Sequence, residues 1–149
     1  MGKTTKHHKA THKKTRRAIT KTYTEKLIVL MFLRMLNTVK LYHWKTFSYA
    51  QHKATDELYA SLNTHIDAFV EIMLGKNGKR VDLTGHRMIS LHDYSNVNDF
   101  RKEINSYKKF LIDMNKDDAV NITNNSDLLN LRDEMLADLN KFTYLLTLK

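Results

Sequence analysis

Residues 41–74 read LYHWKTFSYAQHKATDELYASLNTHIDAFVEIML, a stretch without proline in which a helix can run almost unbroken. Ser48 and Gln51 stand at the positions of a capping box, in which two side chains bond each other's backbone N–H groups at a helix start. Gly75 directly follows the stretch and is placed to end the helix, because glycine adopts the left-handed conformation that often closes helices. We therefore expect one helix from about residue 48 to residue 74.

Two clusters of ionisable side chains share one face of this helix. At about 100° per residue, His52, Asp56, Asp67 and Glu71 fall within about 100° of one another. Along the axis, however, Asp56 and Asp67 are separated by about 16 Å at roughly 1.5 Å per residue. One copy of the helix therefore cannot close both clusters around a single metal ion.

Two antiparallel copies of the helix can bring the clusters together. The pair His52 and Glu71 has the same midpoint in the sequence as the pair Asp56 and Asp67, between residues 61 and 62. A two-fold axis at that midpoint pairs each residue reciprocally with its counterpart, as in any isologous interface. Small side chains near the midpoint permit a close approach: Ala60, Asn63 and Thr64. We expect two equivalent sites of imidazole and carboxylate across such an interface.

The ligand types narrow the choice of metal without settling it. Imidazole and carboxylate groups without sulfur suit iron, manganese or zinc. Because carboxylates stabilise Fe(III), a site of this kind with open positions favours the oxidation of Fe(II). The alternative is that both clusters are ordinary solvated contacts, since side chains four residues apart are neighbours on any exposed helix face.

Three further helices are expected from apolar residues that recur three and four positions apart. The first runs from about Tyr23 to Trp44, behind a capping-box pattern that begins at Thr22. The others run from Val97 to about Asn115 and from about Leu128 to Leu146, with cap-forming residues before the last.

The connection over residues 76–95 is longer than most connections, so we expect a short helix within it, around its apolar segment Met88–Leu91. Four amphipathic helices with one long connection predict an all-α four-helix bundle with a crossover. The length of 149 residues suits a single domain.

Composition excludes several classes of protein. The absence of cysteine removes disulfides and thiolate metal sites. No apolar run reaches the roughly 18 residues that a membrane span needs, and no signal peptide follows the basic N-terminus. We expect a protein that is neither secreted nor membrane-bound.

The positive charge is concentrated at the N-terminus. Residues 1–22 hold eight Lys and Arg and no acid, out of 25 Lys and Arg in the chain. Their low apolar content predicts a disordered arm over residues 1–21, ahead of a folded domain over residues 22–149. The cations are Lys3, Lys6, Lys9, Lys13, Lys14, Arg16, Arg17 and Lys21.

Such an arm suits the phosphate backbone of DNA, which it would bind without sequence preference and with a steep salt dependence. Three other roles stay open: contact with an anionic membrane surface, a nuclear localisation signal in residues 13–17, or solubility.

The motif HW…H-x-x-x-D…D-x-x-x-E resembles that of the Dps mini-ferritins, and it stands here as His43, Trp44, His52, Asp56, Asp67 and Glu71. The resemblance implies a ferritin-like four-helix bundle with a short helix in its crossover. It also implies a hollow dodecameric shell with a ferroxidase centre at each dimer interface. His43, His52 and Asp56 would come from one subunit, and Asp67 and Glu71 from the other. The loop from Lys45 to Tyr49 is shorter than the family usually has.

The resemblance also implies the activity. Fe(II) would be oxidised by hydrogen peroxide or oxygen, and the ferric product stored in the shell. Asp67 and Glu71 would be the main carboxylate ligands with Glu71 bridging, His43 and His52 would supply imidazole, and Asp56 would complete the site. The arm would hold the particle to DNA, in a nucleoid, nucleus or virion, and protect it from oxidative stress.

Two functions of other classes remain open. One is an architectural or virion-associated DNA-binding protein on the same fold, with an inactive metal site. The other is a helical packing or capsid-associated module that takes no metal.

Overall fold

The computed structural model describes Met1 and residues 24–114 and 125–148; residues 2–23, 115–124 and 149 are not described. Four helices make up most of this part: α1 (Glu25–Lys45), α2 (Tyr49–Asn77), α3 (Val97–Asp113) and α4 (Ser126–Leu145). The described residues contain no strand. The predicted all-α class with four helices is therefore confirmed. The predicted disordered arm, beyond Met1, lies outside the described residues.

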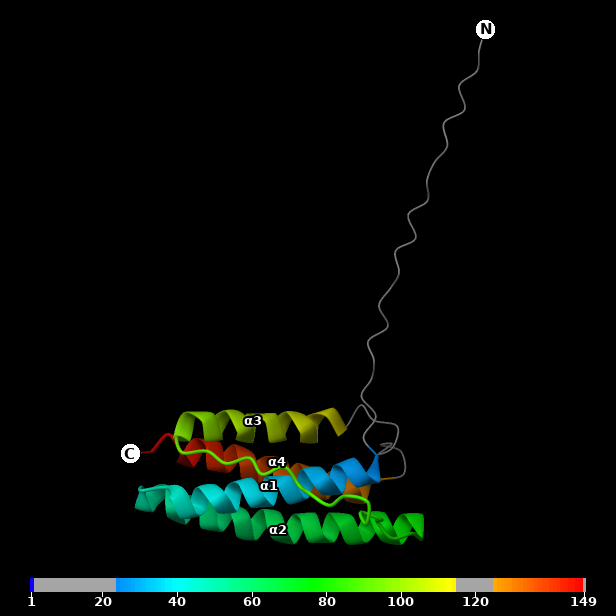
Figure 1. Cartoon of the computed structure of the whole chain (residues 1–149), viewed down its shortest axis with the longest axis horizontal. Helices are drawn as coiled ribbons and strands as arrows, with labels where there is room; N and C mark the ends of the chain where they lie inside the picture. The colour runs from blue at the N-terminus through cyan, green and yellow to red at the C-terminus, as the bar shows by residue number, and fades with distance from the viewer. Residues whose placement is uncertain (2–23, 115–124, 149) are drawn as a thin grey trace.

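The helices pack as two antiparallel pairs joined by a crossover (Figure 1). α1 and α2 form one pair and α3 and α4 the other, and α2 also packs along α4. Because the connection after α2 runs back along the bundle, α3 points in the same direction as α2 (Figure 1). The long connection between the second and third helices is thus a crossover, as expected.

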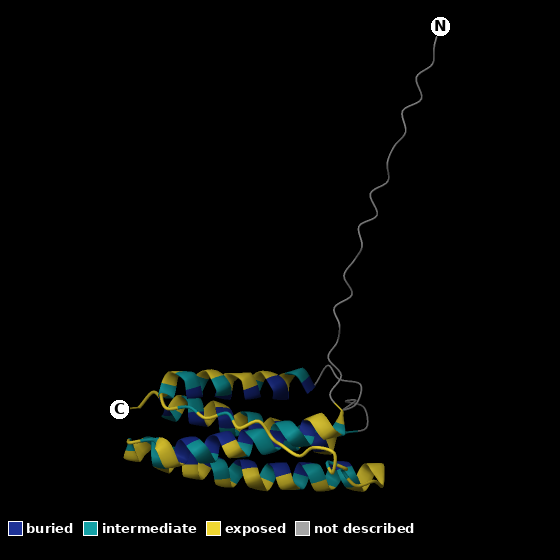
Figure 2. Ribbon diagram, in the orientation of Figure 1, coloured by how far each residue is buried: buried dark blue, intermediate teal, exposed yellow. Residues whose placement is uncertain are grey.

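Aromatic side chains fill the core between the helices. Phe32 of α1 meets Phe69 of α2 edge-on with ring centroids 5.2 Å apart, and meets Phe110 of α3 at 6.0 Å. Tyr42 of α1 stacks on Phe100 of α3 at 3.9 Å. Large rings therefore bridge α1 and α3 across the bundle, and the buried faces of the helices turn towards one another (Figure 2).

The observed start of α1 differs slightly from the expected one. Thr24 is the N-cap, and its side chain accepts a hydrogen bond from the backbone N–H of Leu27 at 3.4 Å. The capping box expected from Thr22 is therefore not the cap of this helix, and Thr22 and Tyr23 lie outside the described residues.

Ser48 caps α2 as predicted, but only half of the capping box forms. The Ser48 hydroxyl accepts from the Gln51 N–H at 3.4 Å. The side-chain oxygen Oε1 of Gln51 accepts instead from the hydroxyls of Tyr42 at 2.8 Å and Thr46 at 2.9 Å. It therefore leaves the Ser48 N–H to the Thr46 hydroxyl at 3.2 Å. The turn between α1 and α2 is thereby tied to the end of α1.

The predicted end of α2 at Gly75 was wrong by about one turn. Gly78 has the left-handed conformation, with φ of 62°, and its N–H bonds the carbonyl of Leu74 at 3.0 Å. Gly75 lies inside the helix, which continues to Asn77.

The prediction of a short helix around Met88–Leu91 is wrong, because residues 79–96 contain a turn at Leu83–His86 and no helix. The segment has to run back along α3, whose 17 residues span about 25 Å. Ten residues after the turn would cover only about 15 Å as helix, against about 33 Å when extended. Lys45 bonds Asp93 at 2.6 Å and His92 bonds Glu103 at 2.8 Å, which fixes the end of the crossover.

Candidate metal half-site

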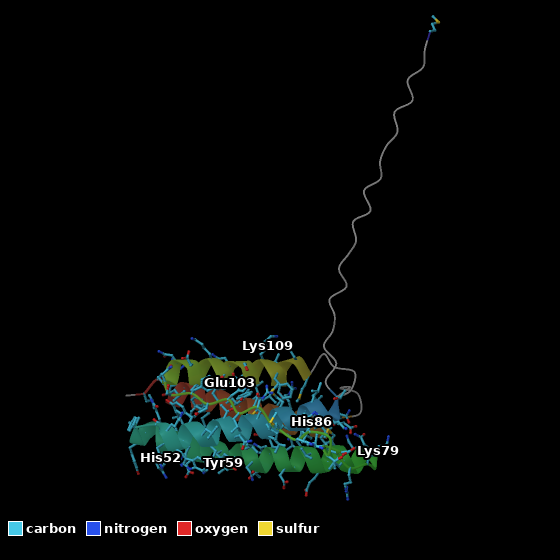
Figure 3. All side chains as sticks on the ribbon, in the orientation of Figure 1. His52, Tyr59, Lys79, His86, Glu103 and Lys109 are labelled. Carbon is cyan, nitrogen blue, oxygen red and sulfur yellow. The ribbon has the colours of Figure 1, made fainter. Side chains whose placement is uncertain are left out.

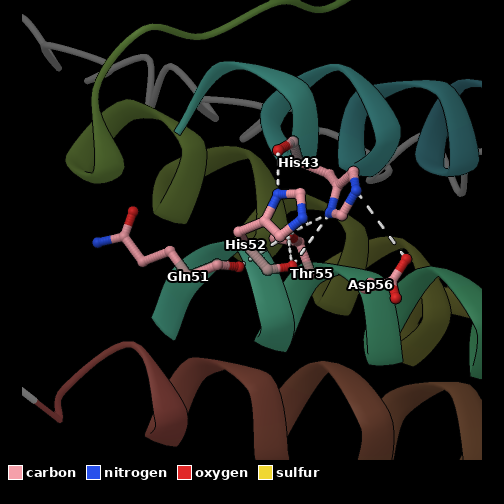
Figure 4. Close-up of polar contacts among 5 residues, drawn as sticks. All are labelled: His43, Gln51, His52, Thr55 and Asp56. Atoms are coloured by element: carbon pink, nitrogen blue, oxygen red, sulfur yellow. Dashed lines mark hydrogen bonds and ion pairs between the residues drawn. The ribbon is translucent and has the colours of Figure 1, made fainter. Parts of the chain in front are cut away.

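His43 and His52 lie side by side at the junction of α1 and α2 (Figure 4). His43 belongs to the last turn of α1 and His52 to the first turn of α2, and the two helices are separated by only three residues. The rings stack with centroids 3.9 Å apart and an interplanar angle of 23°. The short connection therefore does not displace His43 from His52.

Each imidazole is bonded to the backbone of the other histidine. Nδ1 of His43 lies 3.0 Å from the carbonyl oxygen of His52, and Nδ1 of His52 lies 3.0 Å from the carbonyl oxygen of His43. A carbonyl oxygen only accepts, so both Nδ1 atoms carry the hydrogen. In a neutral ring Nε2 then holds the free lone pair. A backbone bond at one ring nitrogen commonly orients a histidine that binds metal through the other.

Thr55 supports this arrangement from beneath. Its hydroxyl is buried, lies 3.3 Å from Nδ1 of His43, and donates to the backbone of the preceding turn, with Gln51 and His52 carbonyls at 2.7 and 2.9 Å. The side chain of Thr55 therefore links the His43 ring to α2.

Asp56 stands at the solvent side of the same cluster. Its Oδ1 lies 3.9 Å from Nε2 of His43, which is too long for a hydrogen bond. Two ligands that each sit about 2.1 Å from one ion can be separated by this much. The side chain of His43 is only 9% exposed, whereas that of Asp56 is 53% exposed. The cluster is thus half-open, with a buried imidazole and an accessible carboxylate.

The structure does not bring Asp67 and Glu71 to the histidines within one chain. Both are exposed, further along the same unbroken helix. Within the described ranges, no group of three or more His, Asp or Glu side chains is arranged to hold a metal ion. We refer to His43, His52 and Asp56 as the candidate half-site, because these three residues would need further ligands to hold a metal ion.

The face of α2 that carries the acids is uncovered. Six residues of this face are exposed: Asp56, Ala60, Asn63, Thr64, Asp67 and Glu71. A groove of about 240 Å³ between α1 and α2 borders it, with Leu33, Leu36 and Val70 in its lining. We refer to these six residues and the groove as the α2 face. It combines small, acidic and apolar groups that a second copy could cover.

Lys40 and two aromatic residues lie beside this face. The Lys40 ammonium is 4.7 Å from the ring centroid of Tyr59 and 5.7 Å from that of Trp44. Trp44 is 68% exposed, which nothing in the sequence pattern indicated. A cation close to the acids of a second copy would add to the attraction between the copies.

Two other histidines lie within hydrogen-bonding distance of carboxylates, which the sequence did not indicate. His65 lies against α4, with Nδ1 3.0 Å from Asp138, and Ser61 bonds the same carboxylate. His92 bonds Glu103 across the crossover. Each pair joins residues on different elements, so no spacing along one helix could have shown it.

Burial would raise the pKa of the Glu103 carboxyl, but hydrogen bonds from His92, Tyr107 and Tyr94 outweigh it and hold the pKa below its usual 4.5. Burial likewise raises the pKa of Tyr107. Glu103 is therefore ionised, and its oxygens are already occupied by hydrogen bonds. This suits a residue that holds the crossover on α3 rather than a free metal ligand.

The eight cations of the arm, predicted to bind DNA, lie outside the described residues. Among the described helices, none is both long and apolar enough to cross a membrane.

Residues 43–146 match a family described as a family of unknown function (DUF5856). The matched range begins at His43 and includes all five residues of the candidate site. No curated protein and no solved structure matches the chain.

Proposed function

The chain belongs to DUF5856, a family of unknown function, and we propose that it is a Dps-like mini-ferritin. In this proposal Fe(II) is the substrate, hydrogen peroxide or oxygen is the oxidant, and the ferric product is stored in a shell of identical subunits. The shell has twelve subunits if it follows the Dps family. The basic arm binds DNA, so the protein resides with DNA inside the cell or virion.

The observation that carries the proposal is the reciprocal bonding of His43 and His52. Both Nδ1 atoms are occupied by a backbone carbonyl, which leaves both Nε2 atoms as bases or ligands. Ordinary packing of two histidines has no need of this shared orientation. It suits a centre whose imidazoles are positioned before metal arrives.

The acids of a second copy would complete each half-site. In an antiparallel pairing of the α2 faces, the partner's Asp67 and the partner's Glu71 meet His43, His52 and Asp56. The carboxylates offset the charge gained when Fe(II) becomes Fe(III). With peroxide as oxidant, two Fe(II) and two protons give two Fe(III) and two water molecules, so both reactants that form hydroxyl radicals are removed.

Iron oxidation by a variant tests the proposal. Asp67→Ala/Glu71→Ala should lower the rate of Fe(II) oxidation by peroxide at least tenfold, followed by absorbance of the ferric product. The matched control is Glu57→Ala/Glu134→Ala, which removes two exposed acids that are not among the proposed ligands. Equal rates in the wild type and the Asp67/Glu71 variant would rule out the ferroxidase.

The alternative is an architectural DNA-binding protein with an inactive site. Because the described part of a single chain holds no complete ligand group, the difference between the two functions depends on what a second copy contributes. That protein would bind DNA and form the same assembly, but its oxidation of Fe(II) would not exceed the rate in buffer.

A further inference from the structure

The first part of the crossover carries cations that are free of ion pairs. Lys79, Arg80 and Arg87 are all exposed. In the part of the chain that the structure describes, none of the three forms a salt bridge. By contrast, four other lysines each pair with a carboxylate in the same structure: Lys45, Lys76, Lys102 and Lys109.

The backbone gathers these cations at one end of the bundle. Gly78 turns the chain out of α2 just before Lys79, and the turn at Leu83–His86 reverses it just before Arg87. Figure 3 shows Lys79 and His86 at this same end. The four residues Lys79, Arg80, His86 and Arg87 thus form one basic rim.

Asp82 shows that the start of α1 is also close to the basic rim. Hydrogen bonds from Thr84 lower the pKa of Asp82, and the charges of Lys26 and His86 lower it further. Lys26 belongs to the first turn of α1, directly after the arm. Thr84 bonds the Asp82 carboxylate twice, and the single negative charge of this acid offsets only part of the surrounding positive charge.

We propose that the basic rim binds the phosphate backbone of duplex DNA as a second contact beside the arm. The inference rests on the DNA binding proposed above and assigns part of it to the folded body. Residues 79–87 hold three Lys or Arg, one acid and no Phe, Tyr or Trp. Exposed cations without these large rings for base stacking suit duplex phosphates better than unstacked single strands.

The salt dependence of DNA affinity measures this contact. For the full chain on a short duplex of mixed sequence, each phosphate contact contributes about 0.9 to the slope of log affinity against log salt. Lys79→Ala/Arg80→Ala/Arg87→Ala should therefore lower the slope by about two to three. The charge-conserving variant Lys79→Arg/Arg80→Lys/Arg87→Lys should keep the wild-type slope.

A control of equal charge separates a local contact from net charge. Lys53→Ala/Lys102→Ala/Lys141→Ala removes three exposed cations near the other end of the bundle and should change the slope by less than one. Equal losses in both alanine variants, or none in the rim variant, would overturn the inference while leaving the arm's DNA binding intact. Circular dichroism checks that each variant remains helical.

A full chain with its eight arm cations replaced by alanine gives an independent measurement. It should retain weak DNA binding that the rim substitutions then remove. Complete loss of DNA binding when only the arm is changed would contradict a DNA contact at the basic rim. Failure of the unaltered chain to bind DNA would instead contradict the proposed DNA binding itself.

Discussion

Thr55 is the residue on which the orientation of the half-site depends most directly. Its buried hydroxyl connects the His43 ring to the backbone of α2. From its position in the sequence, three residues after His52, one can tell only that Thr55 lies on the buried side of the helix. The candidate ligands could be chosen from the sequence because metal-binding chemistry restricts residue types. Their supporting residue could not, because many residue types can fill a buried helix position.

Thr55→Val should weaken metal binding by about tenfold or more, because the shape is kept while the hydroxyl beside His43 is lost. Binding of Co(II) or Zn(II), which oxygen does not oxidise readily, can be measured by calorimetry. Thr143→Val is the matched control, since Thr143 makes the same bond to the carbonyl four residues back in α4. Equal affinities in the two variants would contradict a positioning role for Thr55.

Glu103 makes the fold sensitive to acid. Its folded pKa lies below the usual 4.5 because bonds from His92, Tyr107 and Tyr94 outweigh its burial. Its contribution to stability is therefore complete above pH 4.5 and is lost as the pH falls through the folded pKa. At neutral pH the free energy of unfolding in urea should be about 1–2 kcal/mol higher for the wild type than for Glu103→Gln. The difference should shrink in acid, and a difference that stays constant would contradict this account.

At the scale of the helices, most boundaries follow from capping chemistry. Ser48 caps α2 as its sequence indicates, and α3 begins at Val97 as predicted. The end of α2 was misplaced because two glycines stand three residues apart, and either can close a helix. Only the backbone conformation, with the positive φ at Gly78, distinguishes them.

Alanine at the two glycines should therefore have opposite effects. Neither position has a neighbour within 4 Å of an added Cβ, so the backbone alone decides. Gly78→Ala should lower the free energy of unfolding by about 1–2 kcal/mol, because the φ of 62° at this position is unfavourable for residues with a side chain. Gly75→Ala should stabilise by about 0.5–1 kcal/mol, as expected inside a helix. Thermal unfolding of both variants measures the effect, and equal signs would refute this assignment of the helix end.

At the scale of the whole molecule, the bundle was predictable and the path of its crossover was not. Helical periodicity identified four amphipathic segments whose apolar faces must meet. The crossover segment has apolar residues at Met88, Ile89 and Leu91, and this short apolar pattern was interpreted as a helix. Its extended form follows instead from the distance it must span, which depends on how the four helices are arranged.

The proposed site also depends on the whole assembly, because a single chain does not bring all five candidate ligands together. His52, Asp56 and the acids Asp67 and Glu71 lie on one continuous helix, with His43 at the end of α1. In the proposed site a second copy therefore has to bring the imidazoles and the acids Asp67 and Glu71 together. Whether the copies pair in this way is a property of the assembly, so it calls for a test in which two different chains are mixed.

Complementation supplies that test. A His43→Ala/His52→Ala chain lacks the imidazoles, and an Asp67→Ala/Glu71→Ala chain lacks the acids, so each should be inactive alone. In a mixed dimer both defects fall in one of the two sites, and the other site has intact histidines facing the partner's intact acids. Unfolding and refolding the two variants together should therefore restore about a quarter of the wild-type oxidation rate, because random pairing makes half the dimers mixed. Mixing either variant with itself is the control. No recovery, in a mixture shown by mass spectrometry to contain mixed dimers, would place all the ligands within one chain or exclude the site, since only contacts shared between subunits can complement.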